Sequence, residues 1–302
     1  MNNIKSKFSI KDLENLSGIK AHTIRIWEKR YNLFEPNRTD TNIRYYSLSS
    51  LQKILNISYL NNNGYKISKI ANLSSKQIPA FVNEIANKNN NNNHSVNQLK
   101  IAMINFDQSL FYKTYNDLIS EISFSKIFYN VFIPLLDEIG LLWQTNTITP
   151  AHEHFIVELI KQKIILNTEK ALSNFKVSKK ANTYILFLPE NEVHELGLLF
   201  TNYQLTNSGF HSIYLGGSVP LESLDFLTSQ YNDITFISSF TVKPDKDQIE
   251  KYLSKFSNTL LKDSNNKLIV SGRMTSLIDN QTNPKIIVCN STKEVIENLQ
   301  QV

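Results

Sequence analysis

The chain has 302 residues, of which 41% are hydrophobic and 20% are charged, and these are ordinary values for a soluble globular protein. Its one cysteine, Cys289, excludes an intrachain disulfide and a cysteine-based structural zinc site. The first residues are polar, and no stretch approaches the roughly 20 apolar residues that span a bilayer. We therefore expect a cytoplasmic protein with no membrane partner.

Basic residues are concentrated at the start of the chain. Residues 1–76 contain 13 Lys or Arg and 5 Asp or Glu, a net charge of +8, whereas the other 226 residues have a net charge of −3. A basic head on a mildly acidic body favours a polyanionic partner for the head. On charge alone, the alternative is a basic surface that only faces solvent.

The basic head has the spacing of a helix-turn-helix. Residues 9–17 predict a short helix capped by a serine, Gly18 provides the turn, and residues 21–31 predict a second helix. Residues 36–46 predict a small hairpin, or wing, and a further helix is expected to begin near residue 49.

Two segments of the head resemble the MerR family. Thr23-Ile24-Arg25-Ile26-Trp27-Glu28 is similar to the recognition-helix signature of that family. Arg38, followed six residues later by Arg44-Tyr45-Tyr46-Ser47, is similar to its wing, so the resemblance extends from about residue 8 to residue 75. It implies a winged helix-turn-helix that binds double-stranded DNA at a palindromic operator as a homo-oligomer. Trp27 and Tyr46 have a simpler interpretation as core aromatics.

The chemistry of the basic side chains agrees with this resemblance. Arginine can bind guanine edges with two hydrogen bonds or clamp phosphates, and tyrosine can donate to a phosphate oxygen. The resemblance assigns DNA contacts to four positions, and two more basic residues lie on the second predicted helix. The six candidates for DNA binding are Arg25, Lys29, Arg30, Arg38, Arg44 and Tyr45.

The rest of the chain predicts a linker and two further domains. The asparagine-rich run 87–94 separates a DNA-binding domain at 1–80 from the remainder. Helical apolar spacing at 95–177 fits a four-helix bundle. Short β-rich runs alternate with helical patterns over 178–302, which is typical of a Rossmann-like, doubly wound parallel sheet. The predicted strands are 184–188, 212–215, 234–237, 268–270 and 286–288.

A histidine motif follows the first predicted strand, at the edge of such a sheet where ligands bind. Glu192-Val193-His194-Glu195-Leu196-Gly197 resembles the D-x-H-x-x-G motif of methionine-synthase-like cobalamin domains. The resemblance implies that His194 is the lower ligand of the cobalt, that Glu192 orients its ring and that Gly197 lets the backbone pass close to the cofactor. The other interpretation of His194 is an ordinary histidine at the start of a helix.

Two downstream positions support the resemblance, although each departs from the family pattern. Ser239 matches the serine of the S-x-L motif, with Thr241 in place of leucine. Ser271-Gly272 stands where the family has two glycines, so only Gly272 matches. The nucleotide tail of cobalamin would thread between the sheet and these loops.

The predicted bundle contains a third motif. Trp143 is followed ten and eleven residues later by Glu153-His154, a pattern similar to that of CarH/LitR-type light-responsive regulators. In that family these residues cover the upper face of adenosylcobalamin. The alternative is a core tryptophan beside two surface polar residues. One departure is Gln144, which stands where the family can have a histidine that becomes the upper cobalt ligand after photolysis.

Together these patterns predict a multidomain regulator: an all-α winged helix-turn-helix head, a four-helix bundle and an α/β cobalamin-binding domain. The cofactor-binding candidates are Trp143, Glu153, His154, Glu192, His194, Gly197, Ser239 and Gly272, with His194 also the metal ligand. By resemblance, adenosylcobalamin promotes oligomerisation and repression in the dark, and light cleaves its cobalt–carbon bond and releases the DNA.

Two rival functions remain open from the sequence. One is a MerR-type regulator that needs no cofactor and acts through protein contacts, and the other is a corrinoid methyl-carrier protein. The basic head argues against the carrier, since a methyl carrier has no use for a recognition helix. We find no nucleophile–base set and no two-carboxylate site, so we do not expect an enzyme.

Overall fold

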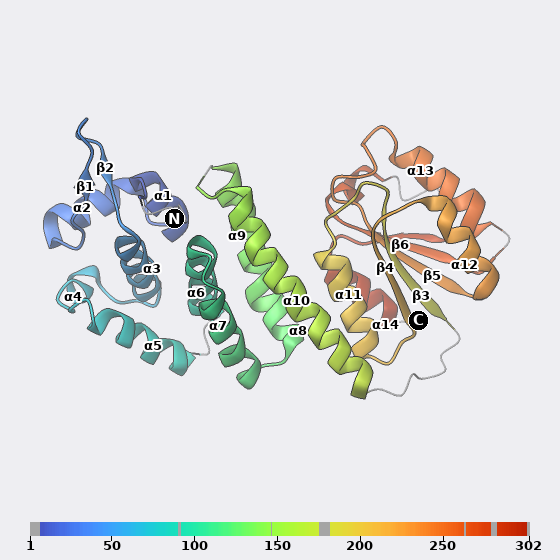
Figure 1. The fold of residues 1–302 in the computed structure, drawn as a ribbon, viewed down its shortest axis with the longest axis horizontal. Coiled ribbons are helices and arrows are strands. Elements are labelled where there is room, and N and C mark those ends of the chain that lie inside the picture. The colour runs from blue at the N-terminus through green and yellow to red at the C-terminus, as the bar shows by residue number, and fades with distance from the viewer. Residues whose placement is uncertain are drawn as a thin grey trace. The chain divides into compact units, whose positions relative to one another are not determined.

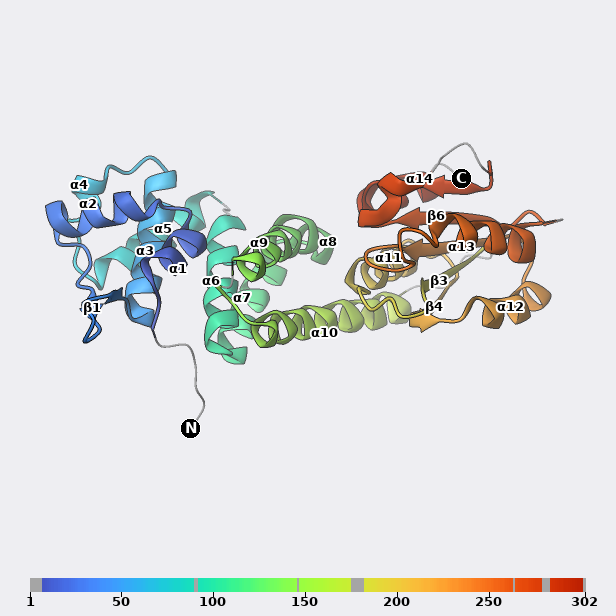
Figure 2. The same cartoon turned by 90° about the horizontal axis from the view of Figure 1, so that it is seen from above.

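The computed structural model describes residues 7–89, 92–145, 147–174, 182–262, 264–278 and 283–300 (Figure 1). The chain divides into two compact units, 1–159 and 160–302. The dividing point lies inside α10 (Pro150–Asn174), a continuous helix of 25 residues that contributes to both units (Figure 2). No helix in the described ranges combines the length and the apolar composition that a membrane crossing requires.

The head is the predicted winged helix-turn-helix. Ser9 and Asp12 form a capping box at the start of the first helix, and Gly18 ends that helix with a positive φ of 74°. A two-residue pairing of antiparallel strands makes the wing. The elements are α1 (Ile10–Ser17), α2 (Ala21–Tyr31), β1 (Asn37–Arg38), β2 (Arg44–Tyr45), α3 (Leu48–Asn62), α4 (Ile67–Ile70) and α5 (Gln77–Asn89).

The asparagine-rich segment predicted as a linker, 87–94, is helical where it is described. It contains the end of α5 and the start of α6, and residues 90 and 91 lie outside the described residues. Side-chain amides do not prevent helix formation, since asparagine costs a helix well under 1 kcal/mol per residue relative to alanine. The boundaries proposed for the head, the linker and the bundle remain predictions, as does the boundary near 177, which falls within the undescribed residues 175–181.

Four helical segments follow, as the apolar spacing predicts. The third of them runs through a π-helical turn, η1, between two α-helical parts. Phe111, Phe128 and Phe132 are fully buried among these helices, with the rings of Phe111 and Phe132 stacked. The elements are α6 (Asn92–Asn105), α7 (Gln108–Glu121), α8 (Phe124–Ile127), η1 (Phe128–Phe132), α9 (Ile133–Gln144) and α10.

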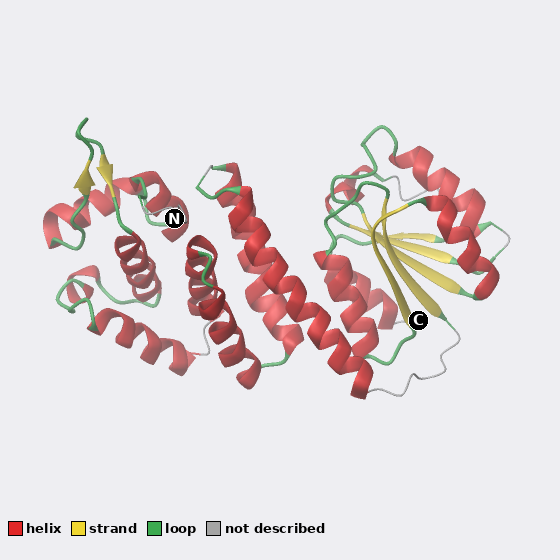
Figure 3. Cartoon of the chain, in the orientation of Figure 1, coloured by secondary structure: helices red, strands yellow, loops and turns green. Residues whose placement is uncertain are grey.

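The second unit contains a five-stranded parallel sheet with the order β4-β3-β5-β6-β7 (Figure 3). All five predicted strands are present. The strands are β3 (Thr183–Pro189), β4 (Ser212–Val219), β5 (Ile234–Ser239), β6 (Lys267–Ser271) and β7 (Ile286–Val288). The helices and short turns between them are α11 (Leu196–Asn207), η2 (Leu221–Leu224), α12 (Asp225–Gln230), α13 (Ile249–Phe256), η3 (Ser257–Leu261), η4 (Arg273–Leu277) and α14 (Thr292–Gln300).

Helices cover both faces of this sheet, so it is doubly wound. Side chains of β3, β5 and β6 alternate between two cores, one shared with α11 and α14 and the other with η2 and α13. Figure 1 shows α11 and α14 on one side of the sheet and α12 and α13 on the other. In the sheet, β4 lies on one side of β3, and β5, the next strand along the chain, lies on the other side of β3. The carboxyl ends of β3 and β5 therefore form the switch point where such sheets bind ligands.

Gly272, at the end of β6, has a structural reason to be glycine. Its φ is +108°, and a Cβ built on it would lie 2.4 Å from the carbonyl oxygen of Phe240. We predict that Gly272→Ala lowers the free energy of unfolding by about 3 kcal/mol, because the methyl group meets rigid backbone at a φ that alanine avoids. Urea unfolding measures this loss.

The matched control for this prediction is Gly140→Ala in α9. A Cβ at Gly140 meets nothing within 4 Å, so the free energy of unfolding should rise by about 0.5–1 kcal/mol. Equal effects of the two substitutions would show that the contact with Phe240 does not restrict position 272.

Candidate functional site

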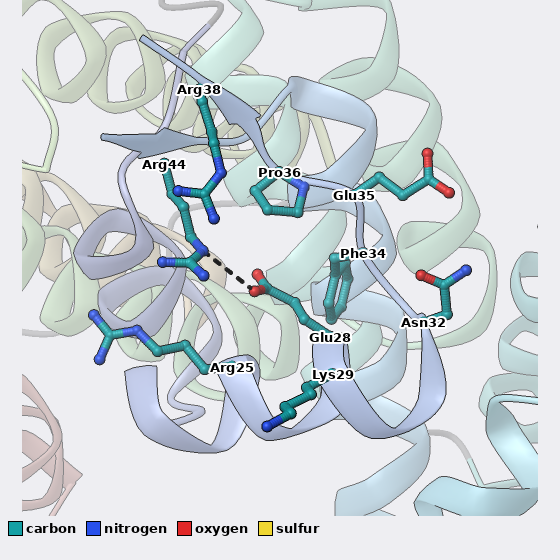
Figure 4. Close-up of a pocket in the computed structure, with 9 residues that line it drawn as sticks. All are labelled: Arg25, Glu28, Lys29, Asn32, Phe34, Glu35, Pro36, Arg38 and Arg44. Atoms are coloured by element: carbon teal, nitrogen blue, oxygen red, sulfur yellow. Dashed lines mark ion pairs between the residues drawn. The ribbon is translucent and has the colours of Figure 1, made fainter. Parts of the chain in front are cut away.

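Four of the six DNA-binding candidates meet around one hollow on the head (Figure 4). The hollow has a volume of about 570 Å³. It is lined by Arg25, Glu28, Lys29, Asn32, Phe34, Glu35, Pro36, Arg38 and Arg44. Four cations and two carboxylates therefore surround the hollow, which leaves it with an excess of positive charge.

The helical period of α2 separates its core side chains from the side chains of the hollow. Ile24 and Trp27 are buried, as predicted for core residues, while Arg25 and Lys29 are exposed. Tyr46 is also buried, at 0% exposure. Trp27 of the recognition-helix motif and Tyr46 of the wing motif therefore stabilise the head, whereas the basic residues Arg25 and Lys29 are exposed.

The wing brings two arginines to the same hollow. Arg38 pairs with Arg44 across the two strands, and paired residues of antiparallel strands project from the same face. Arg38 Nη1 donates to Asn42 Oδ1 at 2.7 Å and to the Asn42 carbonyl oxygen at 3.2 Å. Figure 4 shows both guanidinium groups pointing from the strands toward α2.

The other two candidates do not line the hollow. Tyr45 pairs with Asn37 in the ladder and lies half-buried, with Lys7 Nζ 4.9 Å from the centre of its ring. Arg30 is exposed and lies over the ring of Tyr31 at 5.4 Å. Roles for Tyr45 and Arg30 at the DNA remain predictions.

The second candidate site is at the carboxyl ends of β3 and β5. Glu192 follows β3 and is completely buried. Its carboxylate accepts hydrogen bonds from five backbone N–H groups in two loops. Oε1 accepts from Val193 (2.9 Å) and His194 (3.0 Å), and Oε2 accepts from Thr241 (3.1 Å), Val242 (2.7 Å) and Lys243 (2.9 Å).

The environment of Glu192 keeps it ionised. Burial raises the pKa of the carboxyl, but the hydrogen bonds from Lys243, Val242 and His194 outweigh burial and lower the pKa from 4.5 to about 2. A carboxylate is thus fixed at the switch point over the physiological pH range. The sequence motif indicated Glu192, but the backbone donors of residues 241–243 had no signal in the sequence.

Glu192 also orients the ring of His194. Its Oε1 lies 2.6 Å from Nδ1 of His194. A carboxylate accepts only, so Nδ1 carries the proton in the neutral ring and Nε2 keeps its lone pair. The His194 side chain is 51% exposed, which leaves the ring accessible from solvent. A neutral imidazole oriented by a carboxylate is a suitable metal ligand, so these residues fit the lower cobalt ligand of a bound cobalamin.

Two exposed valines flank the histidine. Val193 is 71% exposed and Val242 is 52% exposed, although both donate their backbone N–H groups to the buried Glu192. The switch point therefore presents apolar side chains around an accessible imidazole nitrogen, which suits a large, mostly apolar macrocycle. Neither valine could be assigned to the site from the sequence, because exposure of an apolar residue in a loop has no sequence signal.

The remaining candidates of the second unit lie near the same edge of the sheet. Gly197 is in the first turn of α11, where a Cβ would lie 3.4 Å from Oγ1 of Thr292 at the start of α14. Ser239 ends β5, is 9% exposed and pairs in register with Ser271 at the end of β6. The close approach to Phe240 gives Gly272 a structural role whether or not it contacts a ligand.

The candidate cap residues belong to the first unit. Glu153 and His154 lie in the first turn of α10, where Glu153 is half-buried and His154 is exposed. Trp143 and Gln144 end α9, and their side chains lie outside the described residues. The grouping of Trp143 with Glu153 and His154 remains a prediction.

His152 has a structural role next to these residues. It is 5% exposed, its Nδ1 lies 2.8 Å from Oγ1 of Thr149, and the backbone N–H of Thr149 donates to the same nitrogen at 3.2 Å. Its ring also contacts the ring of Phe106, with 4.7 Å between the ring centres. These contacts hold His152 at the start of α10, where its ring is turned into the protein.

Comparisons with known families match two segments of the chain, the head and the helical segments that follow it. Residues 8–77 match the MerR HTH family of regulatory proteins, and residues 96–166 match the B12 binding domain. The chain is 26% identical over 215 residues to the HTH-type transcriptional repressor CarH of Myxococcus xanthus, which covers 69% of this chain and 70% of that protein. It is 24% identical over 217 residues to the repressor CarA of the same organism, covering 71% and 70%.

A solved structure shares the fold of the C-terminal part. The monomethylamine corrinoid protein of Methanosarcina barkeri is similar with a TM-score of 0.53 at 14% identity, over 70% of this chain and 99% of that protein. The predicted fold class, a helical head followed by a Rossmann-like domain with a parallel sheet, is confirmed.

The buried carboxylate leads to a prediction about stability. Glu192→Gln should lower the free energy of unfolding at pH 7 by about 3 kcal/mol, because an amide accepts fewer hydrogen bonds and presents its own donors to buried N–H groups. Urea unfolding of the full chain, with circular dichroism as the readout, measures this loss. Glu190→Gln, an exposed change two residues away, serves as the control and should have little effect.

The pH dependence of this effect has a definite sign. The folded-state pKa of Glu192 is depressed, so its contribution is fully present above the ordinary value of 4.5 and is lost as the pH falls toward 2. The difference between the wild type and Glu192→Gln should therefore shrink on acidification below pH 4.5. A difference that stays constant down to pH 3 would contradict the assigned ionisation.

Proposed function

We propose that this chain, which combines a MerR helix-turn-helix region with a B12-binding region, is a transcriptional repressor controlled by adenosylcobalamin. The general part of this proposal, that the chain is a B12-dependent transcription regulator, rests on those two matches and on the similarity to CarH and CarA. The observation that carries cobalamin binding is the pairing of His194 Nδ1 with the buried carboxylate of Glu192 at the switch point, whereas repression and the adenosyl form are proposed from the similarity to CarH and CarA and from the motif at Trp143, Glu153 and His154.

In this proposal His194 would bind the cobalt through Nε2. Glu192 holds the ring in one orientation and keeps the proton on Nδ1, which makes Nε2 the better donor. Val193 and Val242 provide apolar contact around the histidine. Gly197, Ser239 and Gly272 border the path of the nucleotide tail along the edge of the sheet.

Three residues of the first unit are the candidates for contact with the adenosyl group. Trp143 would pack against the adenosyl group, while Glu153 and His154 would hydrogen-bond its polar atoms. When bound, adenosylcobalamin supplies a light-labile cobalt–carbon bond. Because Gln144 stands where the family can have a histidine and His152 is held at the start of α10, neither residue would serve as a second histidine ligand for the cobalt.

The head would bind DNA through the hollow between α2 and the wing. Arg25 and Lys29 on α2 would face the major groove, and Arg38 and Arg44 on the wing would bind phosphates. We propose a palindromic operator and a homo-oligomer, since two-fold DNA sites are read by two-fold protein assemblies.

The fold shared with a corrinoid protein also suits a methyl carrier. A carrier, however, leaves the basic head and its hollow without a role. We therefore consider the methyl carrier less well supported than either kind of regulator. The regulator that needs no cofactor is tested directly by loading the chain with cobalamin.

The decisive experiment loads the full chain with adenosylcobalamin in the dark. We expect the absorption spectrum of a histidine-ligated, base-displaced cofactor, and His194→Ala should abolish the spectral change and weaken binding. His211→Ala, which replaces another histidine of the second unit, is the control. DNA binding should require the cofactor and decrease on illumination. Wild-type protein that binds DNA equally with and without cobalamin would favour the cofactor-independent regulator.

The DNA-binding residues lead to a separate prediction. Affinity for a random duplex should fall steeply with salt, with a slope of log K against log salt of about −0.9 per neutralised phosphate. Arg38→Ala and Arg44→Ala should weaken binding to any sequence, whereas Arg25→Ala should cost about 1–3 kcal/mol more on the specific site. Fluorescence anisotropy at several salt concentrations measures both effects.

Lys251→Ala is the control for that measurement, since it removes one exposed positive charge from α13 in the second unit. It should leave the affinity and the slope unchanged. DNA binding that is independent of salt, or unaffected by the arginine substitutions, would contradict the proposed interface.

A further inference from the structure

Glu28 is an acidic residue in the middle of a basic surface. It lies one helical turn after Arg25 on α2, and it lines the same hollow as Arg25 and Lys29. Figure 4 shows its carboxylate beside Arg44, at the centre of the hollow that we propose for DNA. A negative charge in this place opposes the binding of a polyanion unless it performs another task.

One oxygen of the Glu28 carboxylate accepts a hydrogen bond, and the other forms an ion pair too long to be a hydrogen bond, so the buried Nε of Arg44 has Glu28 only as an ionic neighbour. Oε1 accepts a hydrogen bond from the hydroxyl of Tyr46, and Oε2 lies 3.8 Å from Nε of Arg44. The Glu28 side chain is only 10% exposed. A carboxylate that reads cytosine must present a free oxygen to the groove, so this geometry does not favour base reading by Glu28.

Tyr46 fixes the position of the carboxylate. Its backbone is bonded in both directions to Phe8, at 2.9 and 2.8 Å, and its side chain is completely buried. Burial and the hydrogen bond to Glu28 raise the pKa of the Tyr46 hydroxyl, so it remains a donor. Glu28 is therefore held by the core of the head and cannot follow the motions of an exposed arginine.

The pairing uses one particular edge of the Arg44 guanidinium. Glu28 occupies the Nε side of a group whose side chain is 39% exposed. The terminal nitrogens, Nη1 and Nη2, are then the ones that a phosphate can approach with two hydrogen bonds. Restricting the rotamers of Arg44 before DNA arrives reduces the entropy lost on binding.

We propose that Glu28 is a positioning residue for DNA binding: through the Tyr46–Glu28–Arg44 chain it directs the Arg44 guanidinium toward a backbone phosphate. This inference deepens the proposed function and rests on it. It predicts that neutralising Glu28 changes the affinity for DNA in the direction opposite to the one expected from charge alone. Removing a carboxylate from a DNA-binding surface should strengthen binding by electrostatics alone, whereas removing a positioning group should weaken it.

The test compares Glu28→Gln with Glu35→Gln in the full chain, using a random-sequence DNA duplex as the probe. Both changes remove one negative charge from the lining of the same hollow, and Glu35 is exposed. We expect Glu28→Gln to weaken binding roughly 5- to 10-fold, and to flatten the salt slope by about 0.9, as Arg44→Ala does. Glu35→Gln should strengthen binding, because it removes a negative charge near the polyanion without removing a contact to Arg44.

Two further measurements separate positioning from misfolding. A folding defect lowers the active fraction without changing the salt slope, and Tyr46→Phe should reproduce the direction of Glu28→Gln with the charge retained. In an Arg44→Ala background, Glu28→Gln should cause no further loss. If Glu28→Gln binds as tightly as the wild type while Arg44→Ala binds weakly, the positioning role is wrong and the DNA interface stands. If the wild type shows no salt-dependent binding, the proposed function itself fails.

Discussion

The ligand edge of the second unit depends on one buried carboxylate. Glu192 follows β3, and its six contacts join the loop after β3, the loop after β5 and the ring of His194. Because β3 and β5 flank the switch point, this one side chain both closes the edge of the sheet and sets the direction of the exposed imidazole. A shortened or neutral side chain at this position would leave buried N–H groups unpaired and the histidine without a fixed tautomer.

The head contains a similar arrangement, in which an anchored carboxylate lies beside a planar cationic group. Glu28 is anchored by the buried Tyr46 and pairs with the Nε of Arg44, as Glu192 is anchored by backbone donors and pairs with the Nδ1 of His194. In each case a carboxylate lies next to the inner nitrogen of a planar group and leaves an outer nitrogen available to a partner. The proposed partners differ in charge: a phosphate for the arginine and a cobalt ion for the neutral imidazole.

The departures from the light-responsive pattern lie around the proposed cofactor rather than at its lower ligand. Ser271 replaces a glycine at the end of β6, but Gly272 keeps the positive φ that its contact with Phe240 requires. Gln144 replaces a histidine beside Trp143, while the nearby His152 is engaged at the start of α10. These differences lie away from Glu192 and His194, so they leave the proposed cobalt ligand and the carboxylate that orients it unchanged.

The sequence by itself determined the elements and the identity of the main candidates. Local signals sufficed for the cap at Ser9, the small wing and the five β-rich runs, because caps, turns and alternation depend on neighbouring residues. Only the tertiary structure decided what those residues contact. The donors of residues 241–243 lie about fifty positions from Glu192, and Tyr46 lies 18 from Glu28. Such contacts arise when separate strands and helices pack together, so no local pattern in the sequence specifies them.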